Sequence, residues 1–246
     1  MSHAVIALRS YLVPLVAARA LKLVVLLLVG VLGLAGISLM LSPLSDFFAR
    51  ESLDGLRRAV VFPGLPILAI LMSEIPLRDG IRHRTLLYPL LGPVSRFTLA
   101  WVRTLATGVV LALLLTLVIS VIRLLAKHTE ISWERELLAI GFGAPAYIAL
   151  YGLVHMLVRR GLIAGLGILM LFDGPLSQMP FALRMLAPSY HVNVLADQVI
   201  DFKLPVPIPA PEPSIPVSIA VLVGMTVVLT LGVGIVFGKK DLGELC

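Results

Sequence analysis

The most constraining feature of this sequence is a set of four long stretches that contain no charged residue. They span residues 23–45, 104–122, 137–158 and 214–238. A helix needs roughly 20 apolar residues to cross the ~30 Å hydrocarbon core of a bilayer. Because lipid offers no hydrogen-bond partner to the backbone, a chain crosses it only as a helix or as a closed barrel. Runs of this length therefore predict transmembrane helices.

The composition agrees with a membrane protein. Hydrophobic residues make up 59% of the chain and charged residues 14%, and the mean hydropathy is +1.03. A soluble domain carries about 25% charged residues. We therefore predict an all-α polytopic protein with one transmembrane domain over residues 1–246.

Two further segments are weaker spans. Residues 59–73 are short, and we expect Arg57 and Arg58 to complete this span by reaching toward the lipid head groups. Residues 161–172 cover half a bilayer before Asp173 and the Gly-Pro pair that follows it, so we expect a broken or re-entrant segment there. The prediction is six helices, at about 22–43, 57–73, 102–123, 137–158, 161–183 and 214–238.

The distribution of Lys and Arg predicts the orientation. With both termini cytoplasmic, the inner segments carry twelve basic and four acidic residues, whereas the outer segments carry eight basic and ten acidic ones. Cytoplasmic loops are enriched in Lys and Arg. We therefore expect a multi-pass protein of the plasma (inner) membrane. The basic excess then reflects topology and contact with membrane lipid, and it does not indicate a nucleic-acid partner.

The segments outside these spans are short. Residues 4–21 mix basic and apolar positions with a spacing that suits an N-terminal helix lying in the interface, although an extension of the first transmembrane helix is the alternative. Every second residue of 204–213 is proline, which favours a stiff extended spacer over a ligand-recognition strap. The single Cys246 excludes a disulfide framework or a thiolate metal cluster within one chain.

The loop between the second and third predicted helices is the best indication of function. It is charged and rich in turn residues: Glu74, Asp79, Gly80, Arg82, Arg84, Pro93, Ser95 and Arg96. Ser95 follows a proline and precedes the third helix, so it is placed to act as an N-cap. One reading of the loop is retention of the inner orientation plus lipid contact. Retention needs only basic residues, however, so the acids and the Gly/Pro spacing favour a docking surface.

Motifs for chemistry within the chain are missing. Residues 233–240 lack the pattern of a nucleotide-binding phosphate loop, and neither a serine-hydrolase elbow nor a zinc-protease motif occurs. We expect no enzymatic activity, cofactor or metal in this chain. Two polar groups interrupt the apolar segments. His155 is either a buried structural histidine or part of a proton or substrate path, and Asp173 is either a helix-end carboxylate or a relay.

The loop, two other regions and the hydropathy pattern resemble a known family. The resemblance rests on Glu74, Gly80, Arg84-Thr-Leu-Leu87, Pro89 and Gly92-Pro-Val-Ser-Arg96, with weaker similarity at residues 186–191 and 237–242 and in the six-helix hydropathy. This pattern resembles the permease subunits in the second class of ABC exporters. In this chain the loop has a longer spacer, residues 88–91, before the Pro-Val-Ser-Arg sequence.

The resemblance implies a function. It implies a transmembrane exporter subunit that pairs with a second permease subunit, same or related, and couples through the 74–96 loop to a separate ATPase subunit in two copies. ATP and Mg²⁺ would then be bound by that ATPase. The alternatives are an ion-coupled secondary transporter and a membrane scaffold or assembly factor. The sequence does not indicate the substrate.

Overall fold

The chain is helical throughout the part that the structure describes. The computed structural model describes residues 18–40, 46–76, 95–126, 133–177, 182–197 and 213–239, together with Tyr11 and Leu15. Within these ranges there is no β-strand, which confirms the all-α prediction. Five helices are long and apolar enough to cross a membrane: Arg19–Met40, Glu51–Met72, Arg96–Leu125, Trp133–Leu157 and Ile215–Lys239. Where the sixth span was expected, the structure has a shorter apolar helical segment, Gly161–Ser177.

The order of the elements follows the chain. They are α2 (Arg19–Met40), α3 (Asp46–Ala59), the π-helical turn η1 (Val60–Gly64), α4 (Leu65–Met72), α7 (Arg96–Ala126), α8 (Trp133–Leu157), α9 (Gly161–Ile168), the π-helical turn η3 (Leu169–Asp173), α10 (Gly174–Ser177), the 3₁₀-helix η4 (Ala182–Leu186), α11 (Pro188–Ala196) and α12 (Ile215–Lys239).

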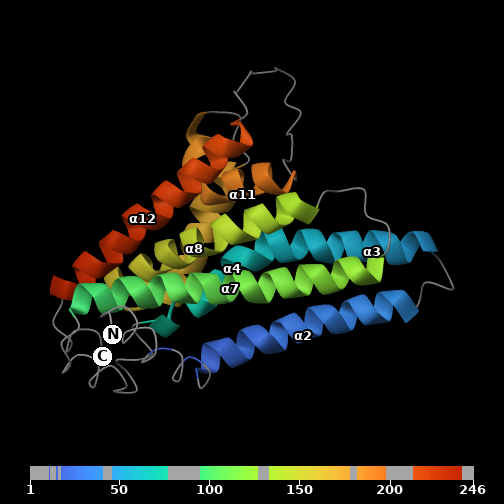
Figure 1. Cartoon of the computed structure of the whole chain (residues 1–246), viewed down its shortest axis with the longest axis horizontal. Helices are drawn as coiled ribbons and strands as arrows, with labels where there is room; N and C mark the ends of the chain where they lie inside the picture. The colour runs from blue at the N-terminus through green and yellow to red at the C-terminus, as the bar shows by residue number, and fades with distance from the viewer. Residues whose placement is uncertain are drawn as a thin grey trace.

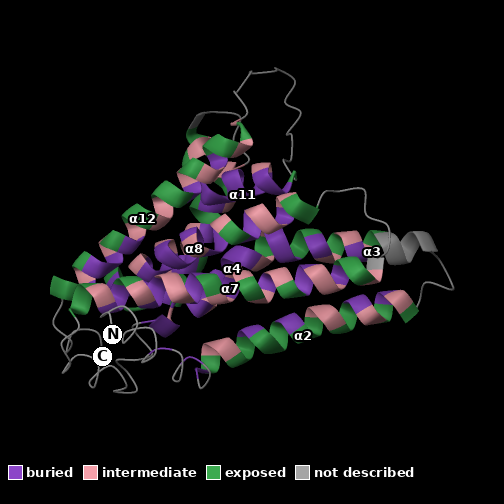
Figure 2. Ribbon diagram, viewed as in Figure 1, coloured by how far each residue is buried: buried purple, intermediate pink, exposed green. Residues whose placement is uncertain are grey.

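Helix α8 forms the centre of the bundle. It packs against α4, α7, α9, α11 and α12, and most of its residues are buried (Figure 2). Gly108 of α7 allows one of these contacts, because a Cβ there would lie 2.8 Å from Cα of Pro145 in α8. Small residues permit this close approach between membrane helices. In contrast, α2 lies at the edge beside α7 (Figure 1) and exposes apolar side chains such as Leu26 and Val29.

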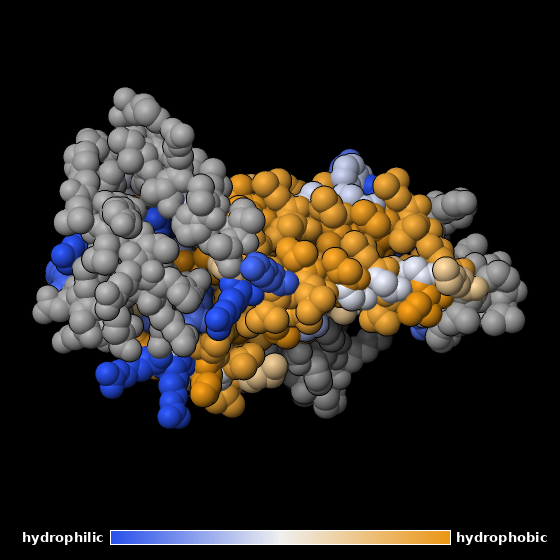
Figure 3. Space-filling view, turned by 90° about the horizontal axis from the view of Figure 1, so that it is seen from below, coloured by the Kyte–Doolittle hydropathy of each residue, from blue (hydrophilic) through white to orange (hydrophobic). Residues whose placement is uncertain are grey.

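The helices end at two opposite ends of the bundle (Figure 1). We call the loop end the one where α2 and α7 start and where α4, α8 and α12 finish. At the far end α2 and α7 finish, and α3, α8 and α12 start. An apolar surface separates the two ends, as Figure 3 shows for the face that it displays. This surface has the character of one that contacts lipid.

The second span starts earlier than predicted. The helix was expected at about 57–73, but α3 begins at Asp46 and continues through η1 into α4. Pro63 lacks an N–H and its ring crowds the preceding turn, so the helix widens there into a π-turn and is not interrupted. Similarly, α8 begins at Trp133, before the charge-free run, with Glu134 and Glu136 in its first turn.

The broken segment also differs from the expectation. We expected a break at Gly174-Pro175, but the helix passes from α9 through the π-turn η3 into α10 and ends at Ser177. Pro175 lies in α10, directly after the π-turn, and does not interrupt the helix.

Two predicted segments lie largely outside the described residues. Of the predicted N-terminal helix over 4–21, the structure describes Tyr11, Leu15 and the residues from Ala18 onward. The side chains of Tyr11, Leu15 and Ala18 are buried. Of the proline-rich segment at 204–213, only the last residue is described.

Candidate functional site

The structure describes the two points at which the predicted coupling loop joins its neighbouring helices. We call them the bases of the loop: the first follows α4 at Glu74, and the second is at Ser95, before α7. Glu74 lies half-buried in the turn after α4, and Ser95 and Arg96 are exposed at the start of α7. The other predicted coupling residues lie outside the described residues: Asp79, Gly80, Arg82, Arg84 and Pro93.

Ser95 is the N-cap of α7, as its position in the sequence predicts. The backbone N–H of Thr98 donates to Ser95 Oγ over 3.1 Å, and the two side-chain hydroxyl oxygens lie 2.8 Å apart. This bond satisfies one of the free N–H groups of the first turn. The second base of the loop is therefore rigidly joined to the longest helix of the structure.

Arg103 is a buried basic residue that follows the loop in the sequence. It lies two turns into α7 with 1% of its surface exposed. Its guanidinium carbon lies 5.4 Å from the centre of the Tyr11 ring, and Nη1 donates a long hydrogen bond of 3.5 Å to the carbonyl oxygen of Pro76. The Tyr11 hydroxyl is hydrogen-bonded to Thr107 Oγ1. Burial raises the pKa of the Tyr11 phenol, so this hydroxyl stays neutral.

His155 is buried and hydrogen-bonded near the loop end, as the structural alternative expected. Its Nδ1 lies 2.8 Å from the carbonyl oxygen of Tyr151 and 3.2 Å from Ser73 Oγ. A carbonyl can only accept, so Nδ1 carries the proton and donates. Ser73 Oγ in turn donates to the carbonyl oxygen of Ile70 over 2.8 Å. The histidine thus joins the end of α4 to α8.

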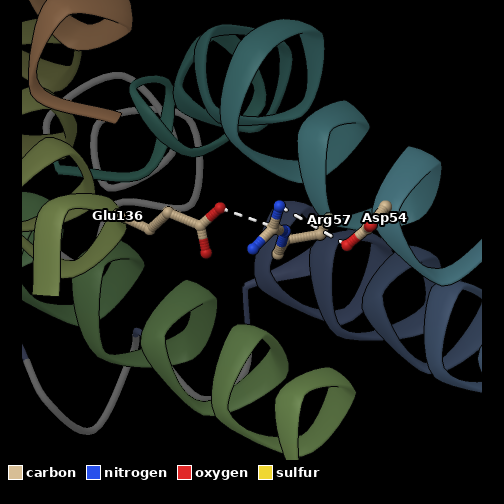
Figure 4. A network of polar contacts seen from close by, with 3 residues as sticks. All are labelled: Asp54, Arg57 and Glu136. Atoms are coloured by element: carbon tan, nitrogen blue, oxygen red, sulfur yellow. Dashed lines mark ion pairs between the residues drawn. The ribbon is translucent and has the colours of Figure 1, made fainter. Parts of the chain in front are cut away.

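At the far end, α3 and α8 hold a buried ion pair. Arg57 Nε lies 3.2 Å from Glu136 Oε1, with the two side chains 3% and 0% exposed, and Arg57 Nη2 lies 3.4 Å from Asp54 Oδ1 (Figure 4). We had expected Arg57 to reach toward the head groups, and this expectation is wrong because its side chain is buried. Its neighbour Arg58 is exposed. Glu136 was missed because it lay in a predicted loop. The acidic first turn after Trp133 was the signal for an earlier helix start.

The Arg57–Glu136 contact is ionic without being a well-aligned hydrogen bond. Among the described residues, neither Arg57 Nε nor either carboxylate oxygen of Glu136 has a hydrogen-bond partner of good geometry. Desolvating two charges is repaid only where the geometry is excellent and the remaining donors and acceptors are satisfied. This pair is therefore a costly feature for the fold to keep.

Asp173 holds the broken segment against α11. It is 3% exposed, and its carboxylate accepts hydrogen bonds from Tyr147 Oη (2.7 Å), Ser189 Oγ (2.8 Å) and the Ser189 backbone N–H (3.1 Å). Ala187, at the N-cap position of α11, has no side chain that can cap the helix. Asp173 supplies that cap from a different segment. Asp173 is therefore a helix-end carboxylate, and the helix that it caps is α11, not the segment in which it lies.

A second polar contact joins α11 to its neighbours. His191 Nε2 donates to the carbonyl oxygen of Met185 over 2.8 Å, and its Nδ1 lies 3.2 Å from Ser218 Oγ of α12. Because Nε2 faces a carbonyl, it carries the proton, and Nδ1 accepts from the serine.

No group of three His, Cys, Asp or Glu side chains in the described part of the chain is placed to hold a metal ion. Comparisons with protein-family models, with curated proteins and with solved structures gave no match. The five apolar helices make the chain a multi-pass membrane protein.

Proposed function

We propose that this chain is the transmembrane subunit of an ATP-driven exporter of the second ABC class. It forms the translocation path with a second permease subunit, and a separate ATPase subunit, in two copies, docks on the 74–96 loop. The observation that carries this proposal is the construction of the loop bases. One base follows α4 at Glu74, and the other is capped into α7 at Ser95.

This construction suits the transmission of force. A rigid-body motion passes efficiently through helices whose ends are fixed, whereas a frayed helix end would absorb it. α7 continues for 31 residues without interruption from the capped base to the far end. A displacement of the loop by nucleotide-dependent closure of the ATPase pair would therefore reach the opposite side of the membrane.

The charge distribution supports a cytoplasmic loop end and cytoplasmic termini in the plasma (inner) membrane. Six exposed basic residues are described at the loop end: Arg19, Lys22, Arg96, Arg159, Arg160 and Lys239. Glu74 is the acidic residue described there. At the far end acids and bases are mixed. We expect a cysteine at position 82, in a Cys246→Ser background, to react with an impermeant maleimide only after the membrane is opened. Reaction from outside in intact cells would reverse the orientation.

The test of the function is co-purification followed by an ATPase assay. A tagged chain purified in mild detergent is expected to retain a subunit that carries a phosphate-loop motif and hydrolyses ATP with vanadate sensitivity. A matched preparation of Glu74→Lys should lose that subunit. A wild-type preparation without any ATPase would refute the exporter proposal.

A second candidate, an ion-coupled transporter, is favoured by one observation. Arg57, Glu136 and Asp173 are ionisable and buried within a protein that is otherwise apolar, and buried ionisable groups in membrane segments mark ion pathways in many transporters. Flux that collapses with a proton or sodium ionophore while ATP is maintained would favour this candidate. A scaffold would show no flux under either condition.

A further inference from the structure

Three segments that are far apart in the sequence converge on one side chain at the loop end. Arg103 of α7 lies against the ring of Tyr11 from the N-terminal segment and donates to the carbonyl oxygen of Pro76, two residues after Glu74. Thr107, one turn further along α7, is bonded to the Tyr11 hydroxyl. The N-terminal segment and the first base of the loop are therefore both attached to α7.

These contacts close the base of the 74–96 loop. The second base is continuous with α7 and is capped at Ser95. The first base follows α4 and is also held to α7 through the Arg103–Pro76 contact. With that contact, both bases are fixed to one helix. A force on the loop then moves α7 as a unit and does not merely bend the turn after α4.

We propose that Arg103 is the positioning residue that couples the 74–96 loop and the N-terminal segment to α7, so that movement of the loop is transmitted to the far end. This inference rests on the proposed function. It assigns a role to a residue outside the loop itself and to Tyr11, and both side chains are buried.

The test measures transmission without needing the substrate. The permease–ATPase complex carries Cys246→Ser, so that Leu124→Cys supplies a single cysteine. Leu124 is 77% exposed at the far end of α7. This cysteine is labelled with an environment-sensitive maleimide dye. In wild type, ATP plus vanadate is expected to change the dye emission. In Arg103→Met the ATPase stays bound and hydrolyses ATP, but the emission change falls at least fivefold. Arg103→Lys, which keeps the charge over the ring, restores at least half of it.

Each other outcome decides the matter. An unchanged response in Arg103→Met, or no response in the wild-type complex, would overturn this inference while the exporter proposal stands. Absence of an ATPase from the wild-type preparation would overturn both. If Arg103→Met does not accumulate in the membrane, Tyr11→Leu replaces it, because that change removes the aromatic face and leaves α7 intact. A full response in Tyr11→Leu would then refute the inference.

Discussion

The two ends of the bundle differ in how many of their charged side chains are exposed. At the far end, Arg57 faces the carboxylate of Glu136, and the Asp173 carboxylate, deeper in the bundle, is held by three hydrogen bonds. At the loop end, the buried Arg103 contacts an aromatic face and a peptide carbonyl, and the other basic side chains described there are exposed. The far end thus buries an ion pair and a hydrogen-bonded carboxylate, whereas most of the basic side chains described at the loop end are exposed.

This difference indicates a division of labour. Opposite charges in a low-dielectric interior attract strongly and hold two helices in one register. Exposed basic residues contribute little to stability and are free to contact lipid or a partner. We infer that the far end maintains the packing of α3, α8 and α11, and that the loop end is the part arranged to receive a partner.

The largest expected effect comes from breaking the ion pair. Glu136→Leu alone leaves the buried Arg57 with only the partly exposed Asp54 as a charge partner, which costs about 3–5 kcal/mol of stability. Arg57→Met alone should cost a similar amount. The double variant should be at least as stable as wild type, because the apolar pair needs no desolvation of charge. Thermal unfolding in detergent measures all three.

The matched control for this series is Arg58→Met, since the adjacent side chain is exposed and should shift the midpoint only slightly. If the double variant were as unstable as the single variants, the pair would be well matched and not costly. The contrast between the ends would then lose its energetic basis. A stable double variant that has lost transport would instead favour the ion-coupled candidate.

The next largest effect is expected at Asp173. Asp173→Ala removes the cap of α11 and leaves the Tyr147 and Ser189 donors unsatisfied, for a cost of about 2–4 kcal/mol. Asp173→Asn keeps one acceptor oxygen and should cost less than half as much. Thermal unfolding and protease sensitivity check both variants. If Asp173→Asn folded normally but abolished transport, Asp173 would act as a relay and not as a structural cap.

Much of the fold could be predicted from the sequence, because membrane spans are set by local composition. The charge-free runs of four helices are long enough to be recognised individually. Ser95 was recognisable because N-capping depends on residues within one turn. Helix starts were less accurate at Asp46 and Trp133, since the helices continue into amphipathic, charged sequence beyond the hydrocarbon-like run.

The buried polar contacts could not be predicted. Arg57 and Glu136 each look like a charge at the end of a span, and only the packing of α3 near α8 brings them together. Asp173 and Ser189 similarly lie in different segments, and the packing of these segments, which no sequence periodicity shows, brings them together. The burial of Arg103 could not be predicted either, because its contact with Tyr11 depends on a segment far away in the sequence.

The third prediction concerns the exposed loop charges. Glu74→Lys or Arg96→Glu should weaken ATPase binding at least tenfold, because a charged contact at an interface is replaced by a repulsive one. Membrane insertion and the unfolding midpoint should stay near the wild-type values. The measurement is the ratio of ATPase to permease after purification, with Lys22→Glu as a control at the same end. Unchanged complex yield in both loop variants would make the loop a retention signal only.

A smaller effect is expected at His155. His155→Asn places an amide donor near the position of Nδ1, so the contacts to Tyr151 and Ser73 can be kept in part. The ATPase rate of the complex should be retained, with a modest decrease in unfolding temperature. A variant that assembles normally but loses transport would revive the proton-path alternative.

The smallest effect should appear as a pH dependence that separates α11 from the loop end. Burial lowers the pKa of His191 below its ordinary value of about 6.5, and the hydrogen bond to the Met185 carbonyl opposes this only in part. The folded state therefore binds this proton less readily than the unfolded state. Its stabilising contribution is complete above the unfolded pKa and declines as the pH falls below it. The unfolding midpoint should thus decrease between pH 7.5 and pH 5.5, and His191→Gln should reduce that decrease.

The ring faces Tyr190 on its own helix, Met185 of η4 and Ser218 of α12, and none of these side chains titrates in that range. An identical decrease in His191→Gln would place the proton-sensitive group elsewhere in the bundle.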